Sequence, residues 1–190
     1  MLNIVIFGPP GSGKGTQSEK LIEKYALTHI STGDILRNEI ETGTKLGDNA
    51  KQYINKGLLV PDEIIIGMIE NKISEIKNQT KGVIFDGFPR TVQQAKALKE
   101  MLTKRGETID LMLYLEVCRE ELIKRLSKRS QTSGRADDTP ETIENRLKVY
   151  EEITSPVMEF YKQEGTYRCI SKTGSVEEIF HEIEIIVDKY

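Results

Sequence analysis

The sequence predicts an α/β fold in which helices flank a parallel five-stranded sheet. Short apolar runs alternate with longer helical patterns along the chain, which is typical of parallel strands joined by helices. The first and fourth runs are almost continuously apolar, as expected for strands covered on both faces. The length of 190 residues suits one compact domain. The expected strands are Asn3–Phe7, Thr28–Ser31, Val83–Asp86, Leu111–Glu116 and Tyr167–Ile170.

Helical periodicity fills the stretches between these strands. Apolar residues recur at intervals of three and four over 65–76 and again over 176–187, so both stretches are predicted to be helices with a core-facing stripe. Two segments are interpreted as insertions. One is the helical stretch from about Thr32 to Lys77. The other is the polar, glycine-containing break Ser130–Gly134, which is expected to be a mobile loop between two helices.

Composition narrows the classes of function. The net charge of −3 argues against a general nucleic-acid binder, although a local positive pocket is compatible with it. Cys118 and Cys169 stand alone, so they predict no metal site and suit a reducing compartment. No apolar run approaches the roughly 20 residues that cross a bilayer, and the short, uncharged stretch Met1–Phe7 does not resemble a signal peptide. A cytoplasmic protein is expected.

A glycine-rich segment, Gly8–Lys14, lies between the first expected strand and a helical run. Its sequence, GPPGSGK, fits the phosphate-loop pattern G-x-x-x-x-G-K. Glycines let backbone N–H groups turn toward phosphate oxygens, the helix start adds about half a positive charge, and Lys14 adds a full one. The alternative is a turn that binds nothing, but the strand–loop–helix context argues against it. The pattern predicts phosphate binding and does not by itself establish catalysis.

One departure from the pattern concerns the magnesium ligand. The residue after the lysine is usually Ser or Thr, whereas here Gly15 follows Lys14 and Thr16 comes one position later. The hydroxyl that would bind Mg²⁺ directly is therefore displaced. Asp86 ends the third expected strand, where an acidic side chain can hold Mg²⁺ or its waters beside the phosphate loop. The alternative for Asp86 is a carboxylate that caps the next turn.

Several arginines have the chemistry of phosphate ligands, because a guanidinium offers a rigid fork of donors. Arg90 follows a tight Gly-Phe-Pro turn, which fixes its direction locally. Arg125 and Arg129 are four residues apart, so they share one face of a helix. For any single arginine, a surface ion pair is the alternative interpretation.

The segment GPPGSGKGTQ at Gly8–Gln17 resembles the adenylate kinase family more than a generic ATPase. The resemblance continues in order along nearly the whole chain, from residue 4 to about 180. It is carried further by STGDILR at 31–37, DGFPRT at 86–91 with Gln94, GRADD at 134–138, NRL at 145–147 and GSV at 174–176. Six arginines fall on family motif positions, too many for the surface-pair interpretation: Arg37, Arg90, Arg125, Arg129, Arg135 and Arg146.

The resemblance implies a P-loop NTPase-type core with two additions. One is a helical insertion over 31–60 that binds the nucleoside monophosphate (NMP), and the other is a short lid over 128–138. The core of this single domain would then comprise 1–30, 61–127 and 139–190. Longer-lidded relatives carry an extra small subdomain, sometimes with zinc-binding cysteines. This sequence lacks both, so a small flap and no structural zinc site are expected.

The implied activity is reversible transfer of the terminal phosphoryl group of ATP to AMP, giving two ADP, with Mg²⁺ as the cofactor of ATP. The implied catalytic residues are Lys14, Arg90, Arg125, Arg129, Arg135 and Arg146. ATP would be bound by Gly11, Ser12, Gly13, Lys14, Gly15, Thr16, Arg129 and Gly174. AMP would be bound by Thr32, Arg37, Leu58, Leu59, Val60, Gly87, Phe88, Pro89, Arg90, Gln94, Arg135 and Arg146. Asp86 would hold Mg²⁺ through water.

This chemistry needs no general base, because the attacking phosphate oxygen is already ionised at neutral pH. Catalysis would come from positioning and from neutralising charge on the moving phosphoryl group. Closure of the lid would deliver Arg135 and expel water together. His29 and His181 lie in no motif and are expected to be structural or exposed.

Specificity for adenine is hypothesised to come from Thr32 and Gln94. Gln94 lies one helical turn beyond Arg90, and an amide can both donate to and accept from adenine. Two alternatives remain: a kinase acting on UMP or CMP, which typically differs at these two positions, and a nucleotide-sensing module without catalysis, which would leave the acceptor arginines unexplained. The expected partners are small nucleotides, with no nucleic acid or membrane, and nothing in the sequence demands more than a monomer.

Overall fold

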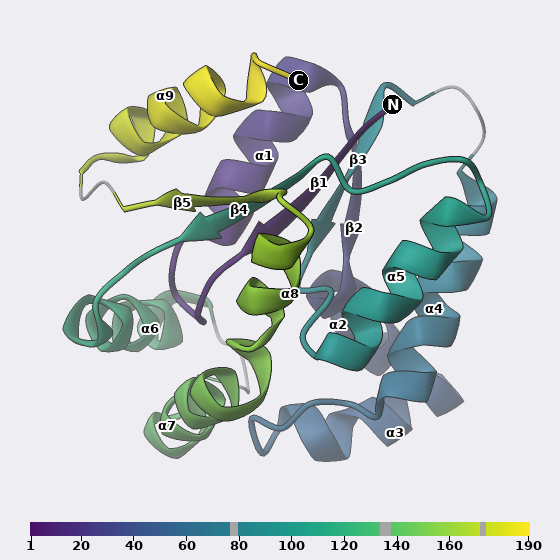
Figure 1. Cartoon of the computed structure of the whole chain (residues 1–190). Coiled ribbons are helices and arrows are strands. Elements are labelled where there is room, and N and C mark those ends of the chain that lie inside the picture. The colour runs from purple at the N-terminus through teal and green to yellow at the C-terminus, as the bar shows by residue number, and fades with distance from the viewer. Residues whose placement is uncertain (77–79, 134–137, 172–173) are drawn as a thin grey trace.

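The computed structural model describes residues 1–76, 80–133, 138–171 and 174–190. Five strands form one parallel sheet in the order β2-β3-β1-β4-β5 (Figure 1). In the register of the sheet, Ile4 on the central strand lies beside Ile84 on one side and Leu111 on the other. The strands are β1 (Leu2–Phe7), β2 (Thr28–Ser31), β3 (Gly82–Asp86), β4 (Leu111–Leu115) and β5 (Tyr167–Ile170).

Helices occupy the connections, and several begin at a polar cap. The side-chain oxygens of Ser31, Thr44, Thr91 and Thr139 each accept a hydrogen bond from the backbone N–H three residues on, which satisfies a donor that the helix start leaves unpaired. The helices are α1 (Lys14–Tyr25), α2 (Thr32–Glu41), α3 (Lys45–Ile54), α4 (Asp62–Glu75), α5 (Val92–Thr103), α6 (Arg119–Ser133), α7 (Pro140–Val149), α8 (Val157–Gln163) and α9 (Val176–Val187). A π-helical turn, Tyr150–Thr154, joins α7 to the segment before α8.

The sheet is covered on both faces, because alternate strand residues point in opposite directions. On one face, Ile4 and Ile6 of β1 pack with Leu21 of α1 and with residues of α9. On the other face, Val5 and Phe7 join a larger apolar cluster that includes residues of α4, α5 and α8. Every one of these strand residues is at most 4% exposed. The nearly continuous apolar sequence of β1 follows from this double cover.

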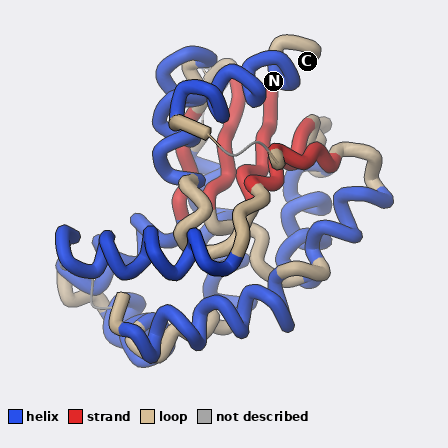
Figure 2. Tube along the Cα trace, turned by 90° about the vertical axis from the view of Figure 1, so that its left-hand side faces the viewer, coloured by secondary structure: helices blue, strands red, loops and turns tan. Residues whose placement is uncertain are grey.

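Two groups of helices gather below the carboxyl ends of the strands. Figure 1 shows α6 and α7 on one side of this end and α2 and α3 on the other, and Figure 2 shows the same helices extending away from the sheet when the molecule is turned. Helices α2 and α3 pack against each other. Helices α6 and α7 share a small apolar cluster of their own, formed by Leu122, Leu126, Ile143 and Leu147. The sheet therefore supports two helical arms that flank its carboxyl end.

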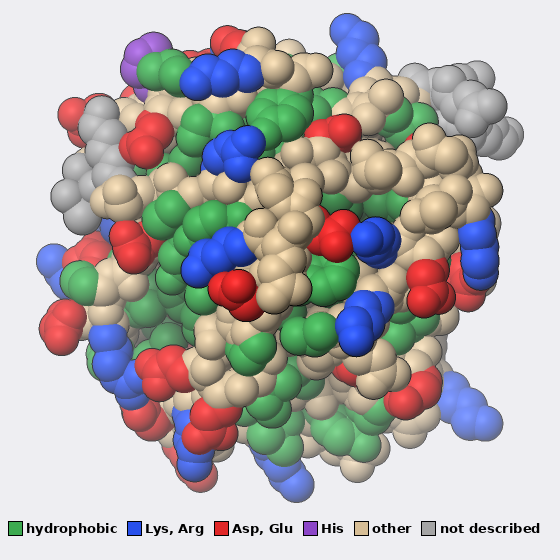
Figure 3. Space-filling model, in the orientation of Figure 1, with side chains coloured by type: hydrophobic (Ala, Val, Ile, Leu, Met, Phe, Trp, Pro, Cys, Tyr) green, Lys and Arg blue, Asp and Glu red, His purple; other side chains and the backbone are tan. Residues whose placement is uncertain are grey.

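The surface shows no segregation of charge on the face seen in Figure 3, where acidic and basic side chains are interspersed with exposed apolar ones. This mixture accords with the small net charge of −3. None of the helices in the described ranges is both long enough and apolar enough to cross a membrane.

The predicted α/β fold with a parallel five-stranded sheet is confirmed, with strand ends that differ from prediction by one residue at most. The predicted loop at Ser130–Gly134 is wrong for its first four residues, because α6 continues to Ser133. The physical reason is that polar residues are tolerated in an exposed last turn. There the hydroxyl of Thr132 donates back to the carbonyl oxygen of Lys128 (3.3 Å), as Ser and Thr commonly do inside helices. Gly134 lies outside the described residues.

Candidate active site

A cavity of about 570 Å³ opens at the carboxyl ends of β1 and β3. The connection after β1 runs to one edge of the sheet and the connection after β3 runs toward the other, so these neighbouring strands define the point at which the strand order reverses. Ligands of open parallel sheets bind at such points. The lining includes the glycine-rich loop after β1, Asp86 and the turn that follows β3, and residues of α6 and α7. We call this cavity the cleft.

A smaller cavity of about 80 Å³ adjoins the cleft, and we call it the side pocket. Seven residues line both spaces, so the two cavities lie against each other: Gly33, Arg37, Gly57, Leu59, Gly87, Arg90 and Arg146. The remaining walls of the side pocket are mostly apolar, contributed by residues of α2, α3 and α4 and by the loop over 57–60. Two buried polar residues, Thr32 and Gln94, also line it. Charge is therefore concentrated at the mouth, and the interior suits an apolar ring with polar edges.

The glycine-rich loop brings Lys14 into the cleft. Helix α1 begins at Lys14, with Gly13 before it in the left-handed region (φ 96°). The ammonium group donates to the carbonyl oxygens of Gly8 (2.8 Å) and Pro9 (3.0 Å), which holds it over the loop. Burial lowers the pKa of Lys14 to about 8. The negative charge of Asp86 opposes this shift, whereas the positive charges of Arg90, Arg146 and Arg129 add to it. A bound phosphate would reverse this effect by stabilising the ammonium form.

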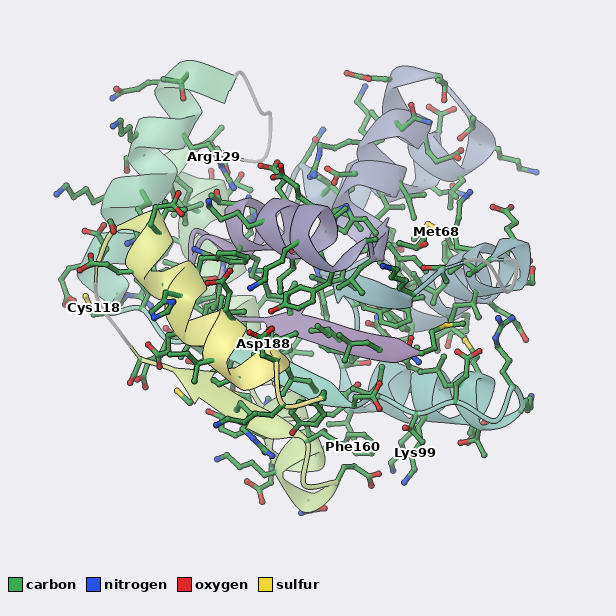
Figure 4. All side chains as sticks on the ribbon, turned by 90° about the horizontal axis from the view of Figure 1, so that it is seen from above. Met68, Lys99, Cys118, Arg129, Phe160 and Asp188 are labelled. Atoms are coloured by element: carbon green, nitrogen blue, oxygen red, sulfur yellow. The ribbon has the colours of Figure 1, made fainter. Side chains whose placement is uncertain are left out.

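Close packing sets α6 against the same loop. Gly11 has φ +84°, and a Cβ there would lie 2.9 Å from Cγ of Leu126, which is too close for any other residue. The backbone of the loop therefore touches α6 directly. Arg125 and Arg129, which are one turn apart on this helix, both line the cleft together with Leu126. Figure 4 shows Arg129 on the side of α6 that faces the rest of the molecule.

One buried carboxylate organises two of the arginines. Asp138, whose side chain is 0% exposed, accepts two hydrogen bonds from Arg129 (Nε to Oδ2, 2.7 Å; Nη2 to Oδ1, 2.6 Å). Oδ1 also accepts from Nη1 of Arg146 at 2.9 Å, so guanidinium groups from α6 and α7 share one anion. A bidentate contact of this kind fixes the plane of the guanidinium as well as its position.

Two further arginines are held by neighbours on their own helices. Arg125 donates from Nε to Oε1 of Glu121 at 2.7 Å, one turn earlier on α6. Arg37 donates to Oδ1 of Asp34, one turn earlier on α2. Burial raises the pKa of Asp34, but the hydrogen bonds from Arg37 and Ser31 outweigh it, so the net shift is downward.

The carbonyl oxygen of Gly87 fixes two residues at the mouth of the side pocket. It accepts from the hydroxyl of Thr32 (2.8 Å) and from Nε of Arg90 (2.8 Å). Gly87 has φ +74°, and a Cβ there would lie 2.8 Å from Oγ1 of Thr32. Thr32 has given its hydroxyl hydrogen to this carbonyl, so it can only accept a hydrogen bond from a ligand. Gln94, in the first turn of α5, is 1% exposed and is hydrogen bonded to the backbone of Arg90 and to Asp62.

The carboxyl-terminal end of α3 contacts α7. The hydroxyl of Thr142 donates to the carbonyl oxygen of Asn55 (3.3 Å), and Nδ2 of Asn145 donates to that of Lys56 (3.3 Å). Gly57 follows with φ +70°, and a Cβ there would lie 2.8 Å from the carbonyl oxygen of Thr142. The two helical arms therefore meet beyond the end of the sheet.

Asp86 is the residue best placed for a divalent cation. Its carboxylate lines the same cleft as the glycine-rich loop, and its negative charge partly offsets the lowering of the pKa of Lys14 by burial. No cluster of three or more His, Cys, Asp or Glu side chains forms a metal site in the described ranges. A cation here would therefore depend on phosphate oxygens and water for most of its ligands. Mg²⁺ has this preference, so the donor set fits it.

The structure brings most of the predicted site residues into the two cavities. Ser12 is buried and lines neither cavity, and Gly174 also lies outside both linings. Arg135 lies outside the described residues. His29 and His181 are both exposed, as expected; His29 also lines the cleft, with its Nε2 3.8 Å from Oδ2 of Asp86.

Sequence reasoning missed the carboxylates that hold the site residues in place. Asp138 was part of the GRADD segment but was given no role, and Asp62 was not singled out. A signal available in the sequence was the position of this acidic residue among arginines that were predicted to bind phosphate, where charge balance calls for a partner. Tyr150 and Thr154 also line the cleft from the π-helical turn, a feature that often marks functional sites but has no sequence pattern of its own.

Comparison with known proteins agrees with this geometry. A family model described as adenylate kinase matches residues 6–166. The adenylate kinase of Phocaeicola vulgatus is 56% identical over 100% of both chains, and that of Bacteroides fragilis is 57% identical over 99% of both. The adenylate kinase of Porphyromonas gingivalis is 50% identical over 100% of this chain and 97% of its own. With identity at this level spanning the glycine-rich loop, the cleft and both helical arms, the chain belongs to the adenylate kinase family.

Proposed function

We propose that this chain catalyses the reversible transfer of the terminal phosphoryl group of ATP to AMP, forming two ADP. The observation that carries the proposal is the pair of adjoining cavities. Its larger part is lined by a phosphate loop and arginines, and its smaller part is apolar with Thr32 and Gln94 in its wall. Two nucleotides bound in these cavities would have their phosphates meet in the cleft. The family supports the same reaction.

Two nucleotides have distinct places in this arrangement. The phosphates of ATP would lie on the loop 8–14 at the start of α1, where backbone N–H groups and the helix dipole favour anions. The base and ribose of AMP would lie in the side pocket, with its phosphate at the mouth between Arg37 and Arg90. The transferring group would then sit beside Lys14, Arg125, Arg129 and Arg146, all of which line the cleft. Arg135 is proposed to join them from the segment outside the described residues.

Phosphoryl transfer here requires no proton abstraction. A phosphate oxygen of AMP, already ionised, forms the new bond to the terminal phosphorus of ATP, and the bond to the bridging oxygen breaks. ADP leaves with the electron pair of that bond. The transition state spreads negative charge over the moving group, so the chain contributes chiefly position and positive charge. His29 is therefore not needed as a base, despite its place in the cleft.

Fixed orientation of the cations distinguishes this site from a merely positive surface. Arg129 and Arg146 are held by Asp138, Arg125 by Glu121 and Arg90 by the carbonyl of Gly87. Donors that are already aimed at the reacting group need no reorganisation during the reaction, which is where most electrostatic catalysis arises. Lys14 is held by two carbonyl oxygens in the same way.

Magnesium is proposed to accompany ATP, with Asp86 as its protein ligand, directly or through water. When bound, Mg²⁺ would neutralise negative charge on the phosphates as it develops during transfer. The side chain of Asp86 is 15% exposed and lines the cleft, so its carboxylate is largely shielded from bulk water but open to a ligand. Thr16 also lines the cleft, from the first turn of α1.

The assignment of 31–60 as the NMP-binding insertion and of 128–138 as a short lid is part of the proposal. Contacts between the end of α3 and α7 support a role for both arms in enclosing the cleft. Enclosure would exclude water that could otherwise take the phosphoryl group.

We also propose that the chain acts as a monomer, because one chain supplies the whole lining, and that it works in the cytoplasm, since both cysteines are exposed free thiols.

A panel of acceptors tests the proposal. ADP formation is measured with ATP and Mg²⁺ and with AMP, GMP, CMP or UMP as the acceptor. We expect AMP to be used with the highest kcat/KM. Equal or better use of UMP or CMP would identify a pyrimidine monophosphate kinase instead, and binding of both nucleotides without any ADP would identify a sensing module.

A further inference from the structure

We propose that Asp62 is a positioning residue that fixes the orientation of the Gln94 amide and thereby selects a 6-amino purine over a 6-oxo purine as the acceptor base. This inference rests on the proposed function, since it concerns the base held in the side pocket. It assigns a specificity role to a carboxylate that would not itself touch the nucleotide.

Both hydrogen-bond partners of Gln94 demand the same orientation of its amide. The backbone N–H of Arg90 donates to Oε1 at 2.7 Å, and a backbone N–H can only donate. Nε2 donates to Oδ1 of Asp62 at 2.8 Å, and an ionised carboxylate can only accept. Turning the amide over would break the first bond and set the carbonyl oxygen of Gln94 against the carboxylate of Asp62. The second partner is charged, so it imposes the stronger constraint.

Asp62 is itself held firmly. It is the first residue of α4, directly after Pro61, and its negative charge is favoured at a helix start. Oδ2 accepts from the hydroxyl of Thr91 at 2.7 Å, and the oxygen of that hydroxyl accepts from the backbone N–H of Gln94 at 3.1 Å. A closed ring of hydrogen bonds thus joins the start of α4 to the start of α5. Both oxygens of Asp62 are used, so the carboxylate cannot rotate without breaking a bond.

The fixed amide leaves one donor and one acceptor for a ligand. A glutamine amide has two N–H groups and two lone pairs on oxygen, and the ring uses one of each. Gln94 lines the side pocket, so we expect its remaining N–H and lone pair to meet a base bound there. Adenine matches them, because its 6-amino group donates and a neighbouring ring nitrogen accepts. Hypoxanthine carries an oxygen at position 6, which would face the lone pair of Gln94 oxygen.

Thr32 does not relieve this mismatch. Its hydroxyl hydrogen is committed to the carbonyl oxygen of Gly87 at 2.8 Å, so it offers only lone pairs to the side pocket. A 6-amino group can donate to it, whereas a 6-oxo group cannot. The two polar residues of the pocket therefore favour the same class of base.

Replacing Asp62 by Asn tests the inference with almost no change in shape. The oxygen of an Asn side chain can face either Gln94 or Thr91, and its NH₂ group then faces the other residue. It can therefore accept a hydrogen bond from one of the two but not from both. The native orientation of Gln94 then leaves the Thr91 hydroxyl without its acceptor, and the turned orientation leaves the backbone N–H of Arg90 facing an NH₂ group. The preference for the native orientation is therefore weakened. We expect the ratio of kcat/KM for AMP to that for inosine monophosphate to be at least about 100 in the wild type and to fall about tenfold in Asp62→Asn.

The matched control is Glu63→Gln, which removes the same charge from the same first turn of α4 at an exposed residue. This variant should keep the AMP to inosine monophosphate ratio within about twofold of the wild type. A second test separates positioning from stability. In a Gln94→Met background, Asp62→Asn should leave the ratio unchanged, because the residue through which Asp62 acts is gone. A purely structural role would lower activity toward both acceptors equally and would add to the effect of Gln94→Met.

Three outcomes overturn the inference: an unchanged ratio in Asp62→Asn, an equal fall in Glu63→Gln, or additive effects with Gln94→Met. Each can occur while the wild type converts ATP and AMP to ADP, so each is distinct from failure of the proposed function. That failure would appear as no ADP from the wild type with any acceptor.

Discussion

Removing the charge of Asp138 should damage both the stability of the fold and the rate of phosphoryl transfer. Asp138→Asn keeps the shape of the side chain while replacing one carboxylate oxygen by an NH₂ group. At least one guanidinium N–H of Arg129 or Arg146 would then face another donor instead of an acceptor. Two arginines would also lose the anion that they share.

The expected loss of stability follows from these contacts. A hydrogen bond to a charged group contributes about 1.5–3 kcal/mol, and breaking a buried ion pair costs about 3–5 kcal/mol. Asp138 is fully buried, but the side chains of Arg129 and Arg146 are 30% and 18% exposed, so water compensates in part. We therefore expect the free energy of unfolding to fall by about 3 kcal/mol. Loss of guanidinium orientation should lower kcat about 100-fold, while KM changes little because the positive charges remain.

Urea unfolding and steady-state ADP formation measure the two effects. Glu141→Gln is the control, because Glu141 is an exposed carboxylate in the first turn of α7, close in sequence to Asp138. It should be indistinguishable from the wild type in both assays. If Asp138→Asn unfolds within about 0.5 kcal/mol of the wild type and keeps kcat within about twofold, then Asp138 does not orient the arginines.

Three other perturbations give separate tests. Lys14→Met should lower kcat about 10³-fold with an unchanged circular dichroism spectrum, since a full charge is lost beside the reacting phosphates; near-normal turnover would exclude the loop from catalysis. Because burial holds the pKa of Lys14 near 8 and phosphate favours the protonated form, ATP affinity should fall as pH rises above about 8, with proton uptake on binding in calorimetry that Lys14→Met abolishes. Gly57→Ala would place a Cβ 2.8 Å from the carbonyl oxygen of Thr142 at a residue with positive φ. It should therefore lower the free energy of unfolding by about 1–2 kcal/mol and raise KM for AMP. Its control is Gly43→Ala, which has a positive φ but open space around it and should affect stability alone.

The sequence predicted the sheet well because its signal is local. Continuous apolar runs such as that of β1 are explained by cover on both faces, and the pattern G-x-x-x-x-G-K requires a strand before it and a helix after it. The end of α6 was mispredicted for a related reason. Polar residues such as Thr132 are neutral in an exposed helical turn, so composition alone could not locate the boundary.

The residues that line the site were predictable to a larger extent than the residues that hold them. Arg129 and Gln94 were given roles from recognisable motifs, but their partners were not. Asp138 is 9 residues from Arg129 and Asp62 is 32 residues from Gln94, so only the folded structure shows these contacts. Contacts between elements are set by packing, and an acidic residue at a helix start has an ordinary explanation in capping or in the helix dipole. The place of His29 beside Asp86 likewise depends on the pairing of β2 with β3, which no motif encodes.

The meeting of α3 with α7 has a thermodynamic consequence. Arg146 lies on α7, whose side chains donate the hydrogen bonds to the end of α3, and it lines both the cleft and the side pocket. Under the proposed function, ATP and AMP would therefore both act on this junction between the arms. Linkage then requires reciprocity. The factor by which bound ATP changes the dissociation constant of AMP must equal the factor by which bound AMP changes the dissociation constant of ATP. If Gly57→Ala loosens the junction, both factors must move toward one together.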